Sequence, residues 1–193
     1  MASKAGLPSG VFPVALVGRR IRLREVTRGD LDAAWRWASD EAFFRYLPNA
    51  QPTRDEEVVW LESVIAESHG SPRRQYQLGI ELIETGELVG MVRLGIESAV
   101  HRSASLGYGL RADQWGQGLT TEAAGLLIGF GFETLGLHRV WATHHPENLA
   151  SRRILDKLGF QEEGRRRDDR YVRGRWYDAI VCSILDHEWA APH

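Results

Sequence analysis

Two glycines, Gly116 and Gly118, stand where a predicted strand gives way to a predicted helix, within residues 106–123. The first amides of a helix have no partner inside the helix, and they point outward along the positive end of its dipole. Glycine lets the backbone curl around an anion without a Cβ in the way. These residues predict a site for a phosphate or pyrophosphate, while a plain tight turn that needs two glycines is an equally open interpretation.

Three kinds of nucleotide ligand compete for this loop. A P-loop requires a lysine after the glycines, and Gly118-Leu119-Thr120 has none. A dinucleotide fingerprint requires a third small residue and an acidic residue at the end of the next strand, but that strand ends at His144-His145. A coenzyme A pyrophosphate requires only the cradle of backbone amides. The two histidines have no third ligand at metal spacing, so no metal site is expected there.

Hydrophobic spacing and capping residues predict the elements that must position the loop. Alternation over 18–25 predicts a half-buried strand, and capping boxes at 27–30 and 53–56 begin two helices. Further strands are expected at 76–83, 88–96, 104–111, 138–143, near 160–170 and at 176–185, and further helices at 119–135 and 148–158. This order predicts an α/β (α+β) fold with a mixed, mostly antiparallel sheet and helices on both faces. We expect one domain over residues 11–193 after a loose tail at 1–10.

Composition limits the classes of function. The 193 residues are 43% hydrophobic and 26% charged, a balance that supports a buried core. The net charge of -2 lacks the basic excess of a nucleic-acid-binding protein. A single cysteine, Cys182, excludes an internal disulfide framework. With no apolar run of about 18 residues and no secretory signal, we expect no membrane partner and a cytoplasmic location.

Four segments together resemble the GNAT superfamily of acyl-CoA-dependent N-acyltransferases, in the RimJ/RimL-type branch of ribosomal-protein N-terminal acetyltransferases. The first two are Trp115-Gly-Gln-Gly-Leu-Thr-Thr-Glu-Ala123, similar to that family's pyrophosphate loop, and Asn148-Leu-Ala-Ser151-Arg-Arg-Ile-Leu-Asp-Lys-Leu-Gly-Phe160. The others are Gly18-Arg-Arg-Ile-Arg-Leu-Arg24, and Tyr177-Asp178 followed by Leu185-Asp-His-Glu-Trp189. The resemblance covers about residues 17–189.

The resemblance implies an acetyl-CoA-dependent N-acetyltransferase and assigns roles to particular residues. Backbone amides would hold the coenzyme A pyrophosphate at Gln117, Gly118, Leu119, Thr120 and Thr121. The amide near Leu110 would bind the pantetheine arm and polarise the thioester carbonyl. Asn148 would bind the pantetheine chain, although it is also an ordinary helix N-cap. Arg153, or its neighbour Arg152, would meet the 3′-phosphate, and a solvated helix face is the alternative for at least one of them.

The resemblance implies that Ser151 is the general acid near the thioester sulfur, because Leu155 stands where other members carry a tyrosine. The alternative is that Ser151 only supports the start of the helix. The general base is harder to place. Many members carry a glutamate where this chain has Ser105, in Ser105-Leu-Gly-Tyr108. Four other residues lie near predicted strand ends: Glu97, His101, His138 and Asp178. A site without a strong base suits an α-amine, of which about a third is neutral at pH 7.5, better than lysine, of which about 0.1% is.

The acceptor amine is the least specified part of the prediction. We expect direct attack of a bound amine on the thioester in a ternary complex, without a cysteinyl intermediate. The acceptor is either a protein N-terminus or a small molecule such as an antibiotic, and a non-catalytic acyl-CoA-binding module is the alternative class. Arginines crowd residues 165–175, either as a solvated hairpin or as a rim that favours an acidic acceptor. A homodimer is left open.

Overall fold

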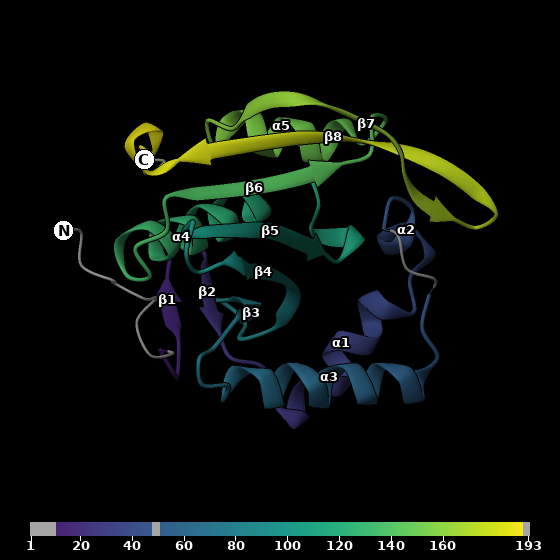
Figure 1. Ribbon diagram of the computed structural model, residues 1–193. Coiled ribbons are helices and arrows are strands. Elements are labelled where there is room, and N and C mark those ends of the chain that lie inside the picture. The colour runs from purple at the N-terminus through teal and green to yellow at the C-terminus, as the bar shows by residue number, and fades with distance from the viewer. Residues whose placement is uncertain (1–10, 48–50, 191–193) are drawn as a thin grey trace.

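The computed structural model describes residues 11–47 and 51–190, so the predicted tail at 1–10 lies outside the described residues. One eight-stranded sheet runs in the order β1-β2-β3-β4-β5-β6-β8-β7 (Figure 1). Its strands are β1 (Ala15–Val17), β2 (Ile21–Arg24), β3 (Gln75–Leu82), β4 (Leu88–Ser98), β5 (Ser103–Leu110), β6 (Arg139–His144), β7 (Gln161–Val172) and β8 (Arg175–Leu185). The helices are α1 (Leu31–Ala38), α2 (Glu41–Phe44), α3 (Arg54–Ser68), α4 (Leu119–Glu133) and α5 (Leu149–Lys157).

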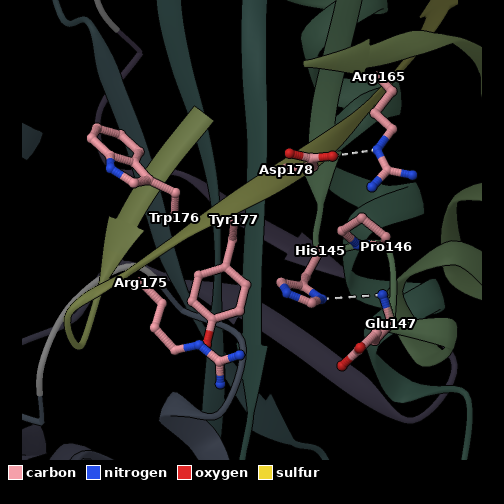
Figure 2. Close-up of a pocket in the computed structure, with 8 residues that line it drawn as sticks. All are labelled: His145, Pro146, Glu147, Arg165, Arg175, Trp176, Tyr177 and Asp178. Carbon is pink, nitrogen blue, oxygen red and sulfur yellow. Dashed lines mark hydrogen bonds and ion pairs between the residues drawn. The ribbon is translucent and has the colours of Figure 1, made fainter. Parts of the chain in front are cut away.

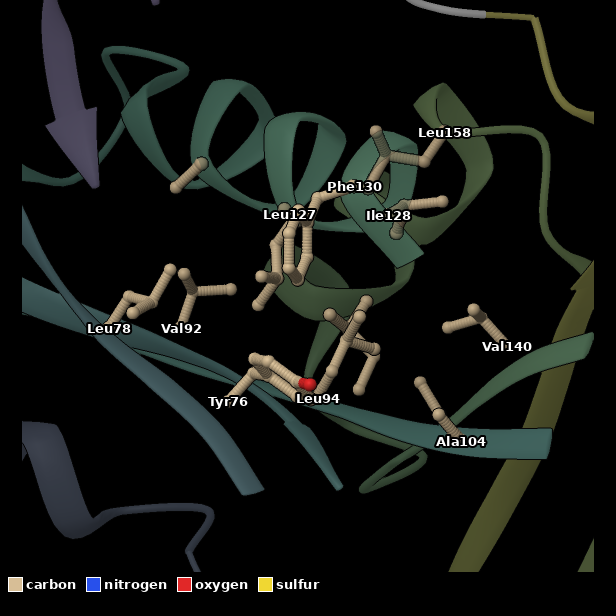
Figure 3. Close-up of a cluster of buried hydrophobic side chains, with 14 of the residues drawn as sticks. Tyr76, Leu78, Val92, Leu94, Ala104, Leu127, Ile128, Phe130, Val140 and Leu158 are labelled. Carbon is tan, nitrogen blue, oxygen red and sulfur yellow. The ribbon is translucent and has the colours of Figure 1, made fainter. Parts of the chain in front are cut away.

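Successive residues of β3 point to opposite faces of the sheet and so identify two layers of packing. Leu78 and Ile80 are fully buried in the main core, which α4 covers (Figure 3). A Cβ on the intervening Gly79 would instead meet Leu88 and Val26, which pack with α1 and α3. Helices therefore cover both faces of a mixed, mostly antiparallel sheet, as the sequence predicts.

The parallel pair β5 and β6 separates partway along its length. Pairing covers only Ser103 to Ser105 on β5 and Arg139 to Trp141 on β6. Beyond these residues the two strands diverge toward their carboxyl ends, which lie at the same end of the sheet because the strands are parallel (Figure 1). β5 stays paired with β4 as far as Leu110, so the opening is on its β6 side only.

Two short elements were not predicted, and the largest shift of a predicted boundary is at the start of the first strand. β1 spans three residues and α2 four, which is too short for a periodic pattern to reveal either. The strand expected from Gly18 begins at Ile21, because 18–20 form the turn between β1 and β2, closed by the Gly18 amide on the Ile21 carbonyl at 2.9 Å. Over the described residues, no helix is long and apolar enough to cross a membrane.

Candidate functional site

The glycine loop has the backbone shape that the sequence predicts. Gly116 and Gly118 have φ angles of 76° and 79°, in the left-handed region that favours glycine. Gly118 caps α4 without a side-chain cap. Within the described chain, the amides of residues 117–121 donate no hydrogen bond to another residue. Five consecutive unsatisfied donors at a helix N-terminus fit a pyrophosphate, with the helix dipole adding to the attraction.

The turn between β1 and β2 fixes the position of this loop. The carboxylate of Glu122, in the first turn of α4, accepts the amides of Arg19 and Arg20 at 2.7 and 2.9 Å. The Arg20 guanidinium pairs with the same carboxylate and donates to the Gln117 carbonyl at 2.7 Å. Its side chain is 51% exposed, so the guanidinium, although paired with Glu122, is accessible beside the loop. Sequence reasoning gave Arg20 no such role, because 97 residues separate it from Gln117.

The Leu110 amide points into the opening between β5 and β6. The Arg111 amide donates to the Val89 carbonyl of β4 at 2.9 Å. Because backbone groups alternate in direction along a strand, the Leu110 N–H and C=O point away from β4. The Leu110 carbonyl accepts the Trp115 indole N–H at 2.6 Å, which connects the strand to the glycine loop. The Leu110 N–H donates no hydrogen bond to another described residue, so it is available to an oxygen in the opening, as an oxyanion-type role requires.

Asn148 and Ser151 meet at the first turn of α5. The Asn148 side-chain oxygen accepts the Ser151 amide at 3.1 Å, so the N-cap function is real and the amide NH₂ is left for other partners. The Ser151 hydroxyl lies 2.8 Å from the Tyr108 hydroxyl of β5. Burial raises the pKa of Tyr108 to about 12, which keeps the phenol neutral. Tyr108 belongs to the motif Ser105-Leu-Gly-Tyr108, where its spacing suggests no role, and only the fold brings it to Ser151.

Two of the four candidate bases lie at the end of the sheet away from the opening. His101 precedes β5 and His138 precedes β6, so both lie at the amino ends of the strands whose carboxyl ends form the opening. Glu97 lies at a bulge of β4, and its carboxylate accepts the hydroxyl of Ser105, the last residue of β5 that pairs with β6, at 2.7 Å. His138 is hydrogen-bonded to Asp186 at 3.0 Å.

The fourth candidate, Asp178, lies beyond the carboxyl end of β6, because Ile180 is the residue that pairs with His144. Its carboxylate is already occupied by the Asp168 amide at 2.9 Å and by the Arg165 guanidinium. These two partners lower the pKa of Asp178, which makes it a weaker base.

A pocket of 310 Å³ opens beside Asp178, between the loop after β6 and the start of β8 (Figure 2). Its lining residues are His145, Pro146, Glu147, Arg165, Arg175, Trp176, Tyr177 and Asp178. The His145 ring lies between two others, with centroids 5.3 Å from Tyr46 and 5.0 Å from Tyr177. His145 and Tyr177 therefore give the pocket an aromatic wall, and Tyr46 packs against His145.

Most arginines of 165–175 have partners within the hairpin or on α2. Arg165 pairs with Asp178, while Arg166 and Arg170 pair with Asp169. Arg173 donates to the Phe44 carbonyl of α2 at 3.2 Å. These contacts favour the solvated-hairpin interpretation for most of the cluster, and they leave Arg175 as the arginine of the pocket without an ion pair among the described residues.

The remaining predicted residues are placed as follows. Thr120 is buried and Thr121 half-buried, while Gln117, Gly118, Arg152 and Arg153 are exposed. Arg152 lies 3.9 Å from Asp156 on the same helix face. No cluster of three or more potential metal ligands occurs in the described part of the chain; the His144 ring bonds the His145 carbonyl, and the His145 ring accepts the Glu147 amide.

Comparison with known proteins identifies the relatives of this architecture. The family model described as the acetyltransferase (GNAT) domain matches residues 20–161. The uncharacterized N-acetyltransferase YoaA of Bacillus subtilis is 32% identical over 91% of this chain and 98% of its own. The ribosomal protein uS5 alanine N-acetyltransferase of Escherichia coli K12 is 28% identical over 95% and 97%. The structure of Mycobacterium smegmatis RimJ in complex with CoA-disulfide superposes with a TM-score of 0.82, 28% identity and coverage of 92% and 90%.

Proposed function

Because the chain belongs to the GNAT family of acetyltransferases, which transfer an acetyl group from acetyl-CoA to an amine, we propose that its acceptor is the α-amine of a polypeptide. The observation that carries this proposal is the position of the candidate bases. His101 and His138 lie at the amino ends of β5 and β6, the Glu97 carboxylate is bonded to the Ser105 hydroxyl, and Asp178 has a lowered pKa. An amine that is partly neutral at physiological pH needs no strong base.

In this proposal each residue at the opening has a separate role in binding or catalysis. The amides of 117–121 hold the pyrophosphate beside the exposed Arg20 guanidinium, and Arg153 on the exposed face of α5 meets the 3′-phosphate. The free amide NH₂ of Asn148 contacts the pantetheine arm. The Leu110 N–H donates to the thioester carbonyl, and the Ser151 hydroxyl donates to the thioester sulfur.

Direct attack of the amine agrees with the state of the one cysteine. Cys182 is buried in β8, and burial raises the pKa of its thiol to about 11. The thiolate is the nucleophilic form of cysteine, and it is scarce at neutral pH when the pKa is that high. A ternary complex therefore fits these side chains better than an acetyl-cysteine intermediate.

A polypeptide acceptor fits the surroundings of the pocket. The rings of Tyr46, His145 and Tyr177 give flat surfaces for the residues that follow an α-amine, and Arg175 gives a donor for a backbone carbonyl or a carboxylate. The similarity to an enzyme named for a ribosomal-protein alanine supports the same class of acceptor. A small-molecule amine is the competing outcome, and an acceptor screen separates the two.

We expect the enzyme to acetylate a peptide α-amine at least about tenfold faster than a lysine in the same peptide. Near pH 7.5 about a third of an α-amine is neutral, against about 0.1% of a lysine side chain. The rate should rise with pH through the pKa of the amine, because only the neutral form attacks. Mass spectrometry of a peptide that carries both amines locates the acetyl group.

Two control peptides make this comparison specific. One has a blocked α-amine and a free lysine, and the other has a free α-amine and arginine in place of lysine. Preferential labelling of lysine, with a rate that is flat above pH 7, would mean that a strong base operates and would contradict the proposal. Release of coenzyme A with small amines but with neither peptide would identify a small-molecule acetyltransferase instead.

A further inference from the structure

Tyr108 lies on β5, at one side of the opening, and contacts the first turn of α5. It lies on β5 beyond Ser105, the last residue that pairs with β6. Its ring packs against the main core, and its hydroxyl lies 2.8 Å from the Ser151 hydroxyl and 3.4 Å from the Ser151 carbonyl. This contact bridges the two sides of the opening where strand pairing no longer does so.

The direction of the Tyr108–Ser151 hydrogen bond follows from the donors and acceptors present. A neutral phenol has one O–H, and both recorded partners of the Tyr108 hydroxyl are oxygens of Ser151. The Ser151 hydroxyl oxygen is the nearer of the two, at 2.8 Å against 3.4 Å for the carbonyl, and a phenol is a better donor than an aliphatic alcohol. We therefore assign Tyr108 as the donor and the Ser151 hydroxyl oxygen as the acceptor. The Ser151 amide is already bonded to Asn148. The hydroxyl hydrogen of Ser151 is therefore the polar group of this residue that is free to turn toward a ligand.

We propose that Tyr108 is a positioning residue for acetyl transfer, which holds the Ser151 hydroxyl so that its hydrogen points to the thioester sulfur. The inference rests on the proposed role of Ser151 as donor to that sulfur. In the reaction the amine nitrogen forms the C–N bond, the C–S bond breaks, and its electron pair goes to sulfur. The proton lost by the amine reaches the thiolate through solvent.

In this proposal Ser151 is a hydrogen-bond donor to the sulfur and not the general acid expected from the sequence, and both Tyr108 and Ser151 keep their own protons. A thiol has an ordinary pKa of about 8.5, far below that of the buried phenol, so proton transfer from Tyr108 to a departing thiolate is uphill. The pair instead stabilises developing negative charge on sulfur with a donor that is oriented before the reaction starts. Donors oriented in advance are worth more than donors that must reorient.

Tyr108→Phe is expected to lower kcat about tenfold and to leave the dissociation constant of coenzyme A within about twofold. Phenylalanine fills nearly the same volume as tyrosine, so we expect the variant to fold normally. Calorimetric binding of coenzyme A checks that the site is intact. Tyr76→Phe is the matched control, because Tyr76 is also buried in the main core but lies on β3, which β4 separates from β5 in the sheet. Its kcat should equal that of the wild type.

A double-mutant cycle separates positioning from an independent effect. In a Ser151→Ala background, adding Tyr108→Phe should change kcat by less than about twofold, because the hydroxyl that Tyr108 orients is already gone. A further tenfold loss in that background, or an unchanged kcat of the single Tyr108→Phe variant, would overturn the inference. If Ser151→Ala is impaired while Tyr108→Phe is not, only this inference fails; if the wild type transfers no acetyl group, the proposed function fails with it.

Discussion

Gly118→Val is expected to weaken coenzyme A binding by about 100-fold, which corresponds to about 2.7 kcal/mol. Gly118 has a φ of 79°, and a β-branched residue is strongly disfavoured there. To avoid the strain, the backbone would rotate, and the amides of 117–121 would no longer point toward the position proposed for the pyrophosphate. In the native backbone a Cβ meets only Arg20, at 3.6 Å, so the substitution acts through backbone shape and phosphate access rather than through core packing.

Gly86→Val is the matched control for this substitution. Gly86 has a φ of 69°, has no atom within 4 Å of an added Cβ, and lies in the turn between β3 and β4. Both variants should lose about 1–3 kcal/mol of stability from the strained backbone. Calorimetry should show the loss of affinity in Gly118→Val alone. Equal affinities for the two variants, with both folded, would show that the loop does not hold the pyrophosphate.

Ser151→Ala is expected to lower kcat about 100-fold and to leave coenzyme A affinity nearly unchanged. A group that stabilises charge only in the transition state affects turnover rather than ground-state binding. Removal of one such donor from other enzymes costs about 10²–10³ in kcat. The fold should tolerate the change, because the N-cap bond of Asn148 uses the Ser151 amide and not its hydroxyl.

Ser63→Ala is the control for the loss of a helix serine hydroxyl. Ser63 lies on α3, where its hydroxyl bonds the Trp60 carbonyl. Steady-state kinetics should show a normal kcat in this variant. A Ser151→Ala variant with unchanged kcat would assign the donor role to water or to another residue, whereas a large rise in the dissociation constant would indicate a binding role.

The parts of the site that depend on local sequence were predictable. The glycine loop, the N-cap at Asn148 and the position of Ser151 all follow from residues within a few positions of one another, because caps and turns are local interactions. The order of the main strands and helices was equally accessible, since their periodicity extends over many residues. β1 and α2 were missed because three or four residues are too few to show a periodic pattern.

Two contacts at the site join segments that are far apart in the sequence, and no local sequence pattern predicts them. Arg20 reaches Gln117 across 97 positions, and Tyr108 reaches Ser151 across 43. The candidate bases near strand ends could not be ranked without knowing which end of β5 and β6 opens. Once the pairing of Ser105 with Trp141 is seen to be the last, the position of each candidate relative to the opening follows.

A crystal structure of the protein with bound coenzyme A tests the central claim most directly. The claim is that the amides at the start of α4 and the opening between β5 and β6 form one acetyl-CoA site. The predicted result places the pyrophosphate within hydrogen-bond distance of the amides of 117–121 and the pantetheine arm between β5 and β6, beside the Leu110 N–H and Asn148. Coenzyme A bound elsewhere, or a pantetheine arm that lies outside this opening, would contradict it.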